Sequence, residues 1–277
     1  MKIRTYIYIV AGLLTLALNS CDKVDEDDRF IYMKPEAMGR NVLVEDFTGQ
    51  NCKNCPDAHV VIEQFQEAYG KDRVVAVSIH AGGLAIFYRD EAHPNGRPYG
   101  LKTDLGETYN NFWNITSWPN GTVNRTGVLA HTSWGAKILE DLQKPSPVNI
   151  DVETAYNNSS RELKVDINTV ALEPISGKIQ VWLLEDGIVA PQAMPDNKTN
   201  PQYVHNNVFR DALNGVWGDD YRASEGASLD FSYSYNVAER YKAENLAVIV
   251  FIYNDNGVLQ VIRKPLFDND TEETPAE

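Results

Sequence analysis

The sequence predicts an α/β domain followed by an all-β domain, because its hydrophobic period changes midway. Before residue 145, continuous apolar segments alternate with segments of helical period, and from Val148 onward apolar and polar residues alternate. A chain of 277 residues suits about two domains, and 43% hydrophobic residues suffice for packed cores. We expect the domains to span 39–145 and 146–267, with the Pro-rich segment 144–147 as their boundary.

Composition excludes several classes of function. The chain carries 39 acidic and 25 basic side chains, a net charge of −14, which argues against binding nucleic acid by neutralising phosphates. Three cysteines are too few for a disulfide scaffold or a four-cysteine zinc site. We therefore expect no nucleic-acid partner, and no motif calls for a cofactor.

The amino terminus predicts export and attachment to a membrane. Residues 1–20 combine a basic start with an apolar segment shorter than the roughly 20 residues needed to cross a bilayer, which is typical of a signal peptide. The segment ending in Cys21 resembles the bacterial lipoprotein box, which implies acylation of Cys21; an ordinary cleaved signal is the alternative. Residues 21–38 are predicted to be an acidic tether and residues 268–277 an acidic disordered tail.

The first domain is predicted from the order strand, helix, strand. Residues 40–47 and 74–79 are rich in β-branched and apolar side chains, which indicates two buried strands. Between them, a helical pattern runs to Tyr69. Cys52 and Cys55 lie between the first strand and the helix, and this βαβ context makes a CxxC sequence a candidate redox motif.

The spacing of the two cysteines suits thiol chemistry. The start of a helix stabilises a thiolate on Cys52, and Cys55 lies within reach to resolve a mixed disulfide. Two other interpretations stay open: an inert structural disulfide, and a copper or zinc site formed by both cysteines with His59 or His80. Apart from the metal hypothesis, His59 is expected to be a surface residue.

Three features of this domain resemble the thioredoxin-like family: Asp46 six residues before Cys52, the CxxC motif, and a later Trp118-Pro119 pair. The resemblance implies that Asp46 relays the proton of Cys55 and that Pro119 faces Cys52. It also implies a cis peptide bond before Pro119, with the backbone beside Trp118 docking an extended substrate. One departure is that no lysine is evident at the position that normally pairs with the buried aspartate.

The second domain is predicted to be an immunoglobulin-like β-sandwich, because several short strands occur in about 120 residues. Its expected strands cover residues 148–154, 163–168, 179–185, 246–253 and 258–262. The last two flank a strong hairpin turn ending in Gly257. The long connection 190–225 is expected to be a packed loop that covers one sheet, with a recognition surface as the alternative.

The whole arrangement resembles the 28-kDa outer-membrane lipoprotein family of Bacteroidetes. The resemblance rests on the lipid box at Cys21, Thr48-Gly49-x-x-Cys52-x-x-Cys55-Pro56, Pro119 with Asn124-Arg125, and the segment 205–210. It implies lipid attachment to the outer membrane, facing either the periplasm or the cell surface. The leading hypothesis is thiol–disulfide exchange with an extracytoplasmic protein. The alternatives are a non-enzymatic adhesin or ligand-binding lipoprotein with a structural disulfide, and metal binding.

Overall fold

The computed structural model describes residues 36–267. The predicted signal peptide, Cys21, most of the acidic tether and the acidic tail lie outside the described residues. Within the described part of the chain, no helix is long and apolar enough to cross a membrane.

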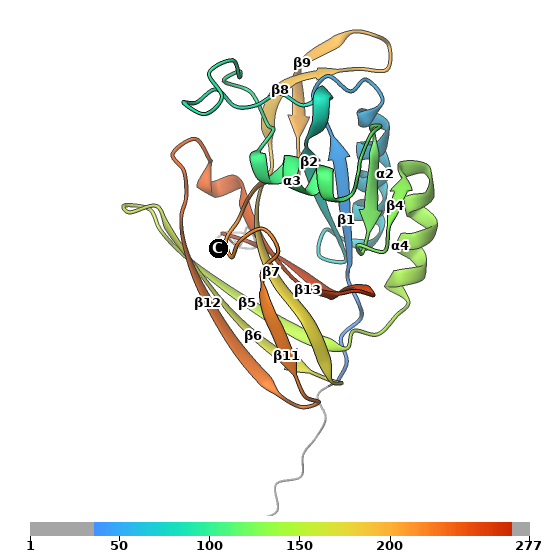
Figure 1. Ribbon diagram of the computed structural model, residues 1–277, viewed down its shortest axis with the longest axis vertical. Coiled ribbons are helices and arrows are strands. Elements are labelled where there is room, and N and C mark those ends of the chain that lie inside the picture. The colour runs from blue at the N-terminus through green and yellow to red at the C-terminus, as the bar shows by residue number, and fades with distance from the viewer. Residues whose placement is uncertain (1–35, 268–277) are drawn as a thin grey trace, which may run out of the picture. The chain divides into compact units, whose positions relative to one another are not determined.

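One mixed sheet of nine strands organises the described residues (Figure 1). Its strand order is β14-β13-β7-β10-β2-β1-β3-β4, and β11 also pairs with β7. β1 (Val42–Thr48) and β2 (Val74–His80) are parallel and buried along their whole length. α2 (Cys55–Tyr69) connects them, so the predicted order strand, helix, strand is confirmed. β3 (Asn120–Val123) pairs antiparallel with the other side of β1 and is followed by β4 (Val128–Ala130).

The two faces of the β1–β2 pair bury separate cores, because successive side chains of a strand point to opposite faces. On one face, Val42 and Val44 pack with α2 and with α4 (Trp134–Leu142). On the other, Leu43 and Phe47 pack with α3 (Asp104–Phe112) and with aromatic residues of β7 and β13.

Toward the carboxyl ends of β1 and β2, the face covered by α2 changes from apolar to polar. Asp46 pairs in register with Ser78, and Thr48 with His80, so these four side chains share that face. The carboxyl ends of parallel strands are where α/β sheets commonly place their ligand and catalytic sites. The sequence of the two strands therefore positions a polar site beside the start of α2.

The carboxyl-terminal part of the chain consists mainly of antiparallel strands. β5 (Val148–Asn157), β6 (Glu162–Ala171) and β12 (Ser228–Asn236) form a separate three-stranded sheet. Its apolar face shares a core with four strands of the main sheet, which are β7 (Ile175–Glu185), β11 (Asp219–Ala223), β13 (Leu246–Asn254) and β14 (Gly257–Pro265). The predicted terminal hairpin is confirmed, since β13 and β14 pair directly.

The main sheet contains strands from both sides of the predicted domain boundary at residues 145 and 146. β10 (Val208–Ala212) pairs with β2 on one side and with β7 on the other. Strands from both predicted domains are therefore hydrogen-bonded into one sheet, and the described residues form one compact unit. The boundary itself stays a prediction.

The expectation that residues 190–225 form a packed loop is wrong. This segment contains most of a hairpin, β8 (Ile188–Ala193) with β9 (Thr199–His205), and then the sheet strands β10 and β11. The reason is burial: Val208 and Phe209 are both buried, and Phe209 packs into the aromatic core beside α3. Figure 1 shows the β8–β9 hairpin at the end of the sheet where β1 finishes.

Candidate functional site

Cys52 and Cys55 form a disulfide at the start of α2, with their Cα atoms 5.4 Å apart. Cys55 is the first residue of the helix, and Pro56 occupies the first turn, where a missing N–H removes no helical hydrogen bond. The N–H of Cys52 donates to the carbonyl oxygen of Gly49 at 2.9 Å. Because β1 ends at Thr48, the disulfide lies at the carboxyl edge of the parallel pair.

Pro119 lies at the same edge of the sheet as the disulfide. The Trp118–Pro119 bond is cis, as predicted. Pro119 directly precedes Asn120, which pairs with Phe47 near the end of β1. The indole of Trp118 lies against Gly82, where an added Cβ would come within 2.0 Å of a ring carbon. The structure thus brings the two cysteines and the cis proline to one edge; docking of a substrate beside Trp118 stays a prediction.

Asp46 is buried below α2, and its nearest ionisable neighbour is His59. Nε2 of His59 lies 3.3 Å from Oδ2 of Asp46 and 3.2 Å from Oγ1 of Thr48. On the other side of the ring, Nδ1 lies 2.8 Å from the hydroxyl of Tyr203 in β9. The His59 side chain is only 12% exposed, so the expectation of a surface residue is wrong. His59 lies four residues after Cys55 and therefore shares its helix face, which points toward β1.

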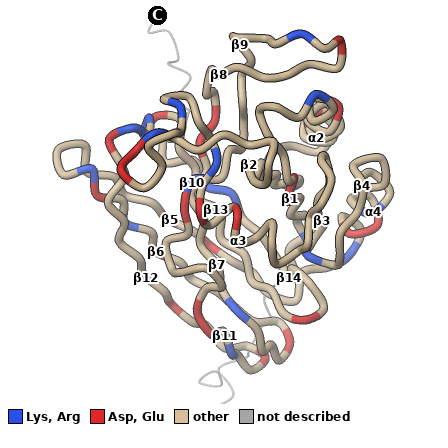
Figure 2. The backbone as a smooth tube through the Cα atoms, turned by 45° about the horizontal axis from the view of Figure 1, so that its top comes forward, with Lys and Arg blue, Asp and Glu red and all other residues tan. Residues whose placement is uncertain are grey.

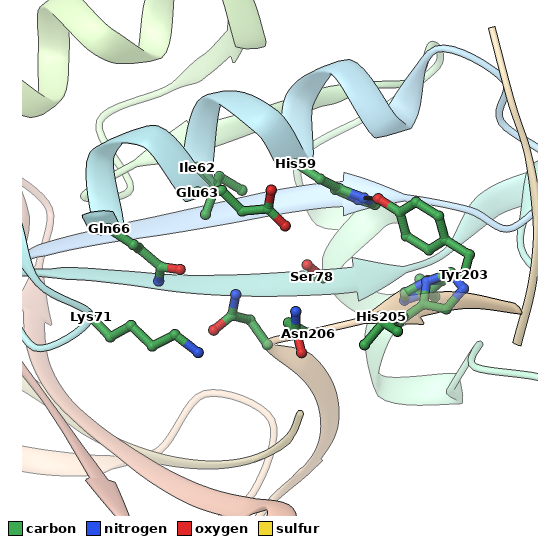
Figure 3. Close-up of a pocket in the computed structure, with 12 residues that line it drawn as sticks. His59, Ile62, Glu63, Gln66, Lys71, Ser78, Tyr203, His205 and Asn206 are labelled. Carbon is green, nitrogen blue, oxygen red and sulfur yellow. Dashed lines mark hydrogen bonds between the residues drawn. The ribbon is translucent and has the colours of Figure 1, made fainter. Parts of the chain in front are cut away.

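A cavity of about 70 Å³, the histidine cavity, lies where α2, β2 and β9 meet (Figure 3). Its lining includes His59, His80, Tyr203, His205 and Asn207. The ring centroids of His80 and His205 are 5.3 Å apart, and neither imidazole is in good hydrogen-bonding geometry with another described group. Burial lowers the pKa of His205 to about 4 and holds the pKa of His80 well below its usual value. Both rings are therefore neutral at pH 7.

The described residues contain no group of three or more His, Cys, Asp or Glu side chains arranged to hold a metal ion. Cys52 and Cys55 are joined to each other, so their sulfur atoms are not thiolate ligands in this state.

The β8–β9 hairpin is hydrogen-bonded to the loop that carries the disulfide, and Figure 2 shows this hairpin close to α2. Nε2 of Gln192 donates to the carbonyl oxygen of Cys52 at 2.9 Å. The N–H of Ala193 donates to the carbonyl oxygen of Gln50 at 2.8 Å, and Nζ of Lys53 donates to Oδ1 of Asn197 at 3.2 Å. As a result, Cys52 is only 2% exposed.

The segment between β2 and α3 also forms hydrogen bonds with the loop that carries Cys52. The N–H of Asn51 donates to the carbonyl oxygen of Leu84 at 2.9 Å. The side-chain amide of Gln50 donates to the carbonyl oxygen of Tyr99 at 2.9 Å and accepts from the N–H of Leu101 at 3.3 Å. The loop that carries Cys52 is therefore bound to two segments distant in sequence.

A buried ion pair lies on the opposite face of β1. The guanidinium of Arg125 donates to both carboxylate oxygens of Glu45 at 3.0–3.3 Å, and Thr122 donates to the same carboxylate at 2.7 Å. The guanidinium also lies 4.6 Å from the ring centroid of Tyr253 and 4.8 Å from that of Phe251. This cluster joins β1, β3 and β13. Among the described residues it makes no contact with the disulfide, so we do not assign it a role in thiol chemistry.

Sequence reasoning missed Gln192 and Tyr203, because both come from the hairpin, more than a hundred residues after the cysteines. The one sequence feature near these residues was the segment 205–210, which is part of the family resemblance. This segment begins at His205, the last residue of β9.

Comparison with known proteins places these features in a family context. The sequence model of the family described as outer membrane protein Omp28 matches residues 106–269, more than half of the chain. Among solved structures, HBP35 of Porphyromonas gingivalis is 16% identical, with a TM-score of 0.63 over 88% of this chain and 80% of that one. A domain of the outer membrane lipoprotein Omp28 from Porphyromonas gingivalis is 24% identical over 44% of this chain and 88% of its own, with a TM-score of 0.32. No curated protein matches the chain. The likeness to HBP35 supports the fold alone.

Proposed function

This chain belongs to the outer membrane protein Omp28 family and is located in the outer membrane, and from that premise we propose that it exchanges thiols and disulfides with extracytoplasmic proteins through Cys52 and Cys55. The observation that carries the proposal is the disulfide at the first turn of α2, on the same sheet edge as the cis peptide bond before Pro119. This arrangement supports a thioredoxin-like interpretation of the β1–α2–β2 unit.

The chemistry is a transfer of two electrons between sulfur atoms. A thiolate of a partner dithiol attacks Sγ of Cys52, the bond between the two sulfurs of this chain breaks, and Cys55 leaves as a thiolate that takes up a proton. The second thiolate of the partner then displaces Cys52, which leaves the partner oxidised and this chain reduced. Asp46, buried on the face of β1 that α2 covers, is the proposed donor of the proton to Cys55.

Exchange requires that the hairpin moves. Cys52 is 2% exposed, and the hydrogen bonds from Gln192 and Ala193 hold the hairpin over it. Local opening of such a covering element costs less free energy than global unfolding. The β8–β9 hairpin therefore acts as a cover that admits a partner only when it lifts.

Attachment through Cys21 completes the proposal. Each buried methylene contributes about 0.8 kcal/mol, so a multiply acylated cysteine holds a protein stably on a membrane. In this proposal the acidic residues after Cys21 link the lipid anchor to the rest of the chain.

Trapping variants test the exchange. Cys55→Ser keeps the attacking thiol and removes the resolving one, so it accumulates mixed disulfides with partner proteins, which non-reducing electrophoresis detects. Cys52→Ser is the matched control and is expected to trap far less. Equal trapping by both variants, or none by either, would contradict the proposal.

A second candidate is a non-enzymatic surface protein in which the disulfide is structural, and the low exposure of Cys52 favours it. A ligand would then bind in a groove of about 1020 Å³ beside α3, where Phe112 is 61% and Trp217 37% exposed. In that case the double variant with Phe112→Ala and Trp217→Ala lowers the adherence of cells that carry the protein. The cysteine variants leave adherence unchanged. Loss of adherence in Cys52→Ser alone would argue against this candidate.

A further inference from the structure

We propose that His59 is a positioning residue that moves the proton of Asp46 to and from the histidine cavity during thiol exchange. This inference rests on the proposed function and adds to it the route by which the proton of a buried carboxyl group reaches solvent. A buried Asp46 can serve repeated turnovers only if its proton has such a route.

The contacts of His59 carry the inference. One ring nitrogen, Nε2, lies 3.3 Å from Oδ2 of Asp46, and its hydrogen bond in this state is with Oγ1 of Thr48 at 3.2 Å. The other, Nδ1, lies 2.8 Å from the hydroxyl of Tyr203, and both residues line the histidine cavity. Figure 3 shows the imidazole pointing at the Tyr203 hydroxyl, between α2 and β9. The ring thus has one nitrogen toward the buried acid and the other toward a polar space that is large enough to admit water.

His80 and His205 are less suited to this role. Both rings are buried, and burial keeps them neutral near pH 7, whereas His59 remains 12% exposed. An imidazole has a nitrogen on each side of its ring, so it can accept a proton at one nitrogen and release a proton from the other. The other titratable groups around His59 come from every neighbouring element: Asp46 of β1, Glu63 and Lys71 in and after α2, His80 of β2, Tyr203 and His205 of β9, and Arg210 of β10.

The proton moves as follows when the chain is reoxidised by a partner disulfide. The thiol of Cys55 gives its proton to Asp46, and its thiolate attacks Sγ of Cys52 in the mixed disulfide. The Cys52–Cys55 bond forms, and the partner sulfur leaves as a thiolate that takes a proton from solvent. Asp46 then passes its proton to Nε2 of His59, which releases a proton from Nδ1 toward Tyr203 and the cavity. Reduction runs the same steps in reverse.

The test follows the resolution step in the full chain. Reduced protein is mixed with oxidised glutathione, and the rate at which Cys55 displaces glutathione from Cys52 is measured from pH 6 to pH 9. His59→Gln is expected to lower this rate about tenfold at pH 7. The difference should shrink above pH about 8.5, where a cysteine thiol loses its proton to solvent without help. Tyr203→Phe, which keeps the ring, should produce a smaller decrease of the same shape.

Two controls separate a proton route from a structural effect. His131→Gln changes a histidine in the short 3-10 helix just before α4, outside the cavity, and should leave the pH profile unchanged. Alkylation of the Cys52 thiolate by iodoacetamide should proceed within twofold of wild type in every variant, because that step needs no proton from Asp46.

The outcomes are distinguishable. Parallel pH profiles for wild type, His59→Gln and Tyr203→Phe would overturn the inference. If His59→Gln does not fold, Tyr203→Phe decides alone, and a profile identical to wild type counts against the proton route. If wild-type reduced protein forms no Cys52–Cys55 bond with glutathione, the proposed function itself fails.

Discussion

The side-chain amide of Gln192 donates a hydrogen bond to the carbonyl oxygen of Cys52 at 2.9 Å, and it also lies 3.4 Å from the carbonyl oxygen of Gly49. Through this contact a hairpin 140 positions away holds the loop that carries the disulfide.

The contact predicts that Gln192 controls access to the disulfide. Gln192→Leu removes the donor, and one net hydrogen bond is worth about 1 kcal/mol, so hairpin opening becomes roughly fivefold more frequent. We expect dithiothreitol to reduce the Cys52–Cys55 bond faster by a similar factor. Gln202→Leu, an exposed glutamine on β9, is the matched control. Equal rates for both variants and wild type would show that the hairpin does not limit access.

The contact between Gly82 and Trp118 predicts a local steric effect. Gly82 has φ +71, and a Cβ there would lie 2.0 Å from the indole of Trp118. Gly82→Ala should lower the free energy of unfolding by about 2 kcal/mol or more and displace Trp118. The adjacent Gly83 has nothing within 4 Å, so Gly83→Ala should be almost neutral. Urea denaturation with tryptophan fluorescence measures both, and equal effects would contradict the packing described.

The buried pair of Glu45 and Arg125 predicts strongly non-additive mutations. Arg125→Met leaves a carboxylate buried without its partner and should lower the free energy of unfolding by about 3–5 kcal/mol. The double variant with Glu45→Leu removes both charges and should cost less than Arg125→Met alone. Urea denaturation of the single and double variants checks this, and additive costs would show that the charges do not compensate each other.

The histidine cavity predicts a loss of stability in mild acid. The pKa of His205 is lowered by burial to about 4, against about 6.5 in an unfolded chain. Between these values the unfolded chain binds more protons, so the free energy of unfolding falls as pH decreases, by about 1.4 kcal/mol per unit for this residue. Above pH about 6.5 the contribution is fully present and constant.

The measurement is urea denaturation at pH 7, 6 and 5. Carboxylates also respond to pH, so the comparison is with His205→Gln, whose stability should fall by less per pH unit than that of wild type. His131→Gln should keep the wild-type slope. The same slope in all three proteins would mean that His205 is not kept neutral by the fold.

The buried strands and the cysteine site follow directly from local sequence patterns. Residues 40–47 and 74–79 are rich in β-branched and apolar side chains, and they contain most of β1 and β2. The position of Cys52 and Cys55 at the start of a helix, and the cis bond before Pro119, are also as predicted. These features depend on residues that are near each other in the chain.

The features that the sequence did not predict depend on distant pairs. The helical pattern around His59 predicts a surface residue, because that pattern contains no information about Tyr203, which lies 144 positions later and contacts the His59 ring. In the same way, β10 is a short segment whose burial arises only when it inserts between β2 and β7. The cover over the disulfide and the continuous sheet are therefore properties of the tertiary structure, which local periodicity does not specify.

The most direct test of the proposed exchange is the equilibrium between the purified protein and glutathione. The fraction of oxidised protein is measured by alkylation and mass spectrometry across a series of ratios of reduced to oxidised glutathione. An exchanging disulfide predicts a reduction potential clearly above about −300 mV, within reach of cellular thiol couples. A potential below about −300 mV would identify the Cys52–Cys55 bond as a structural disulfide and contradict the account.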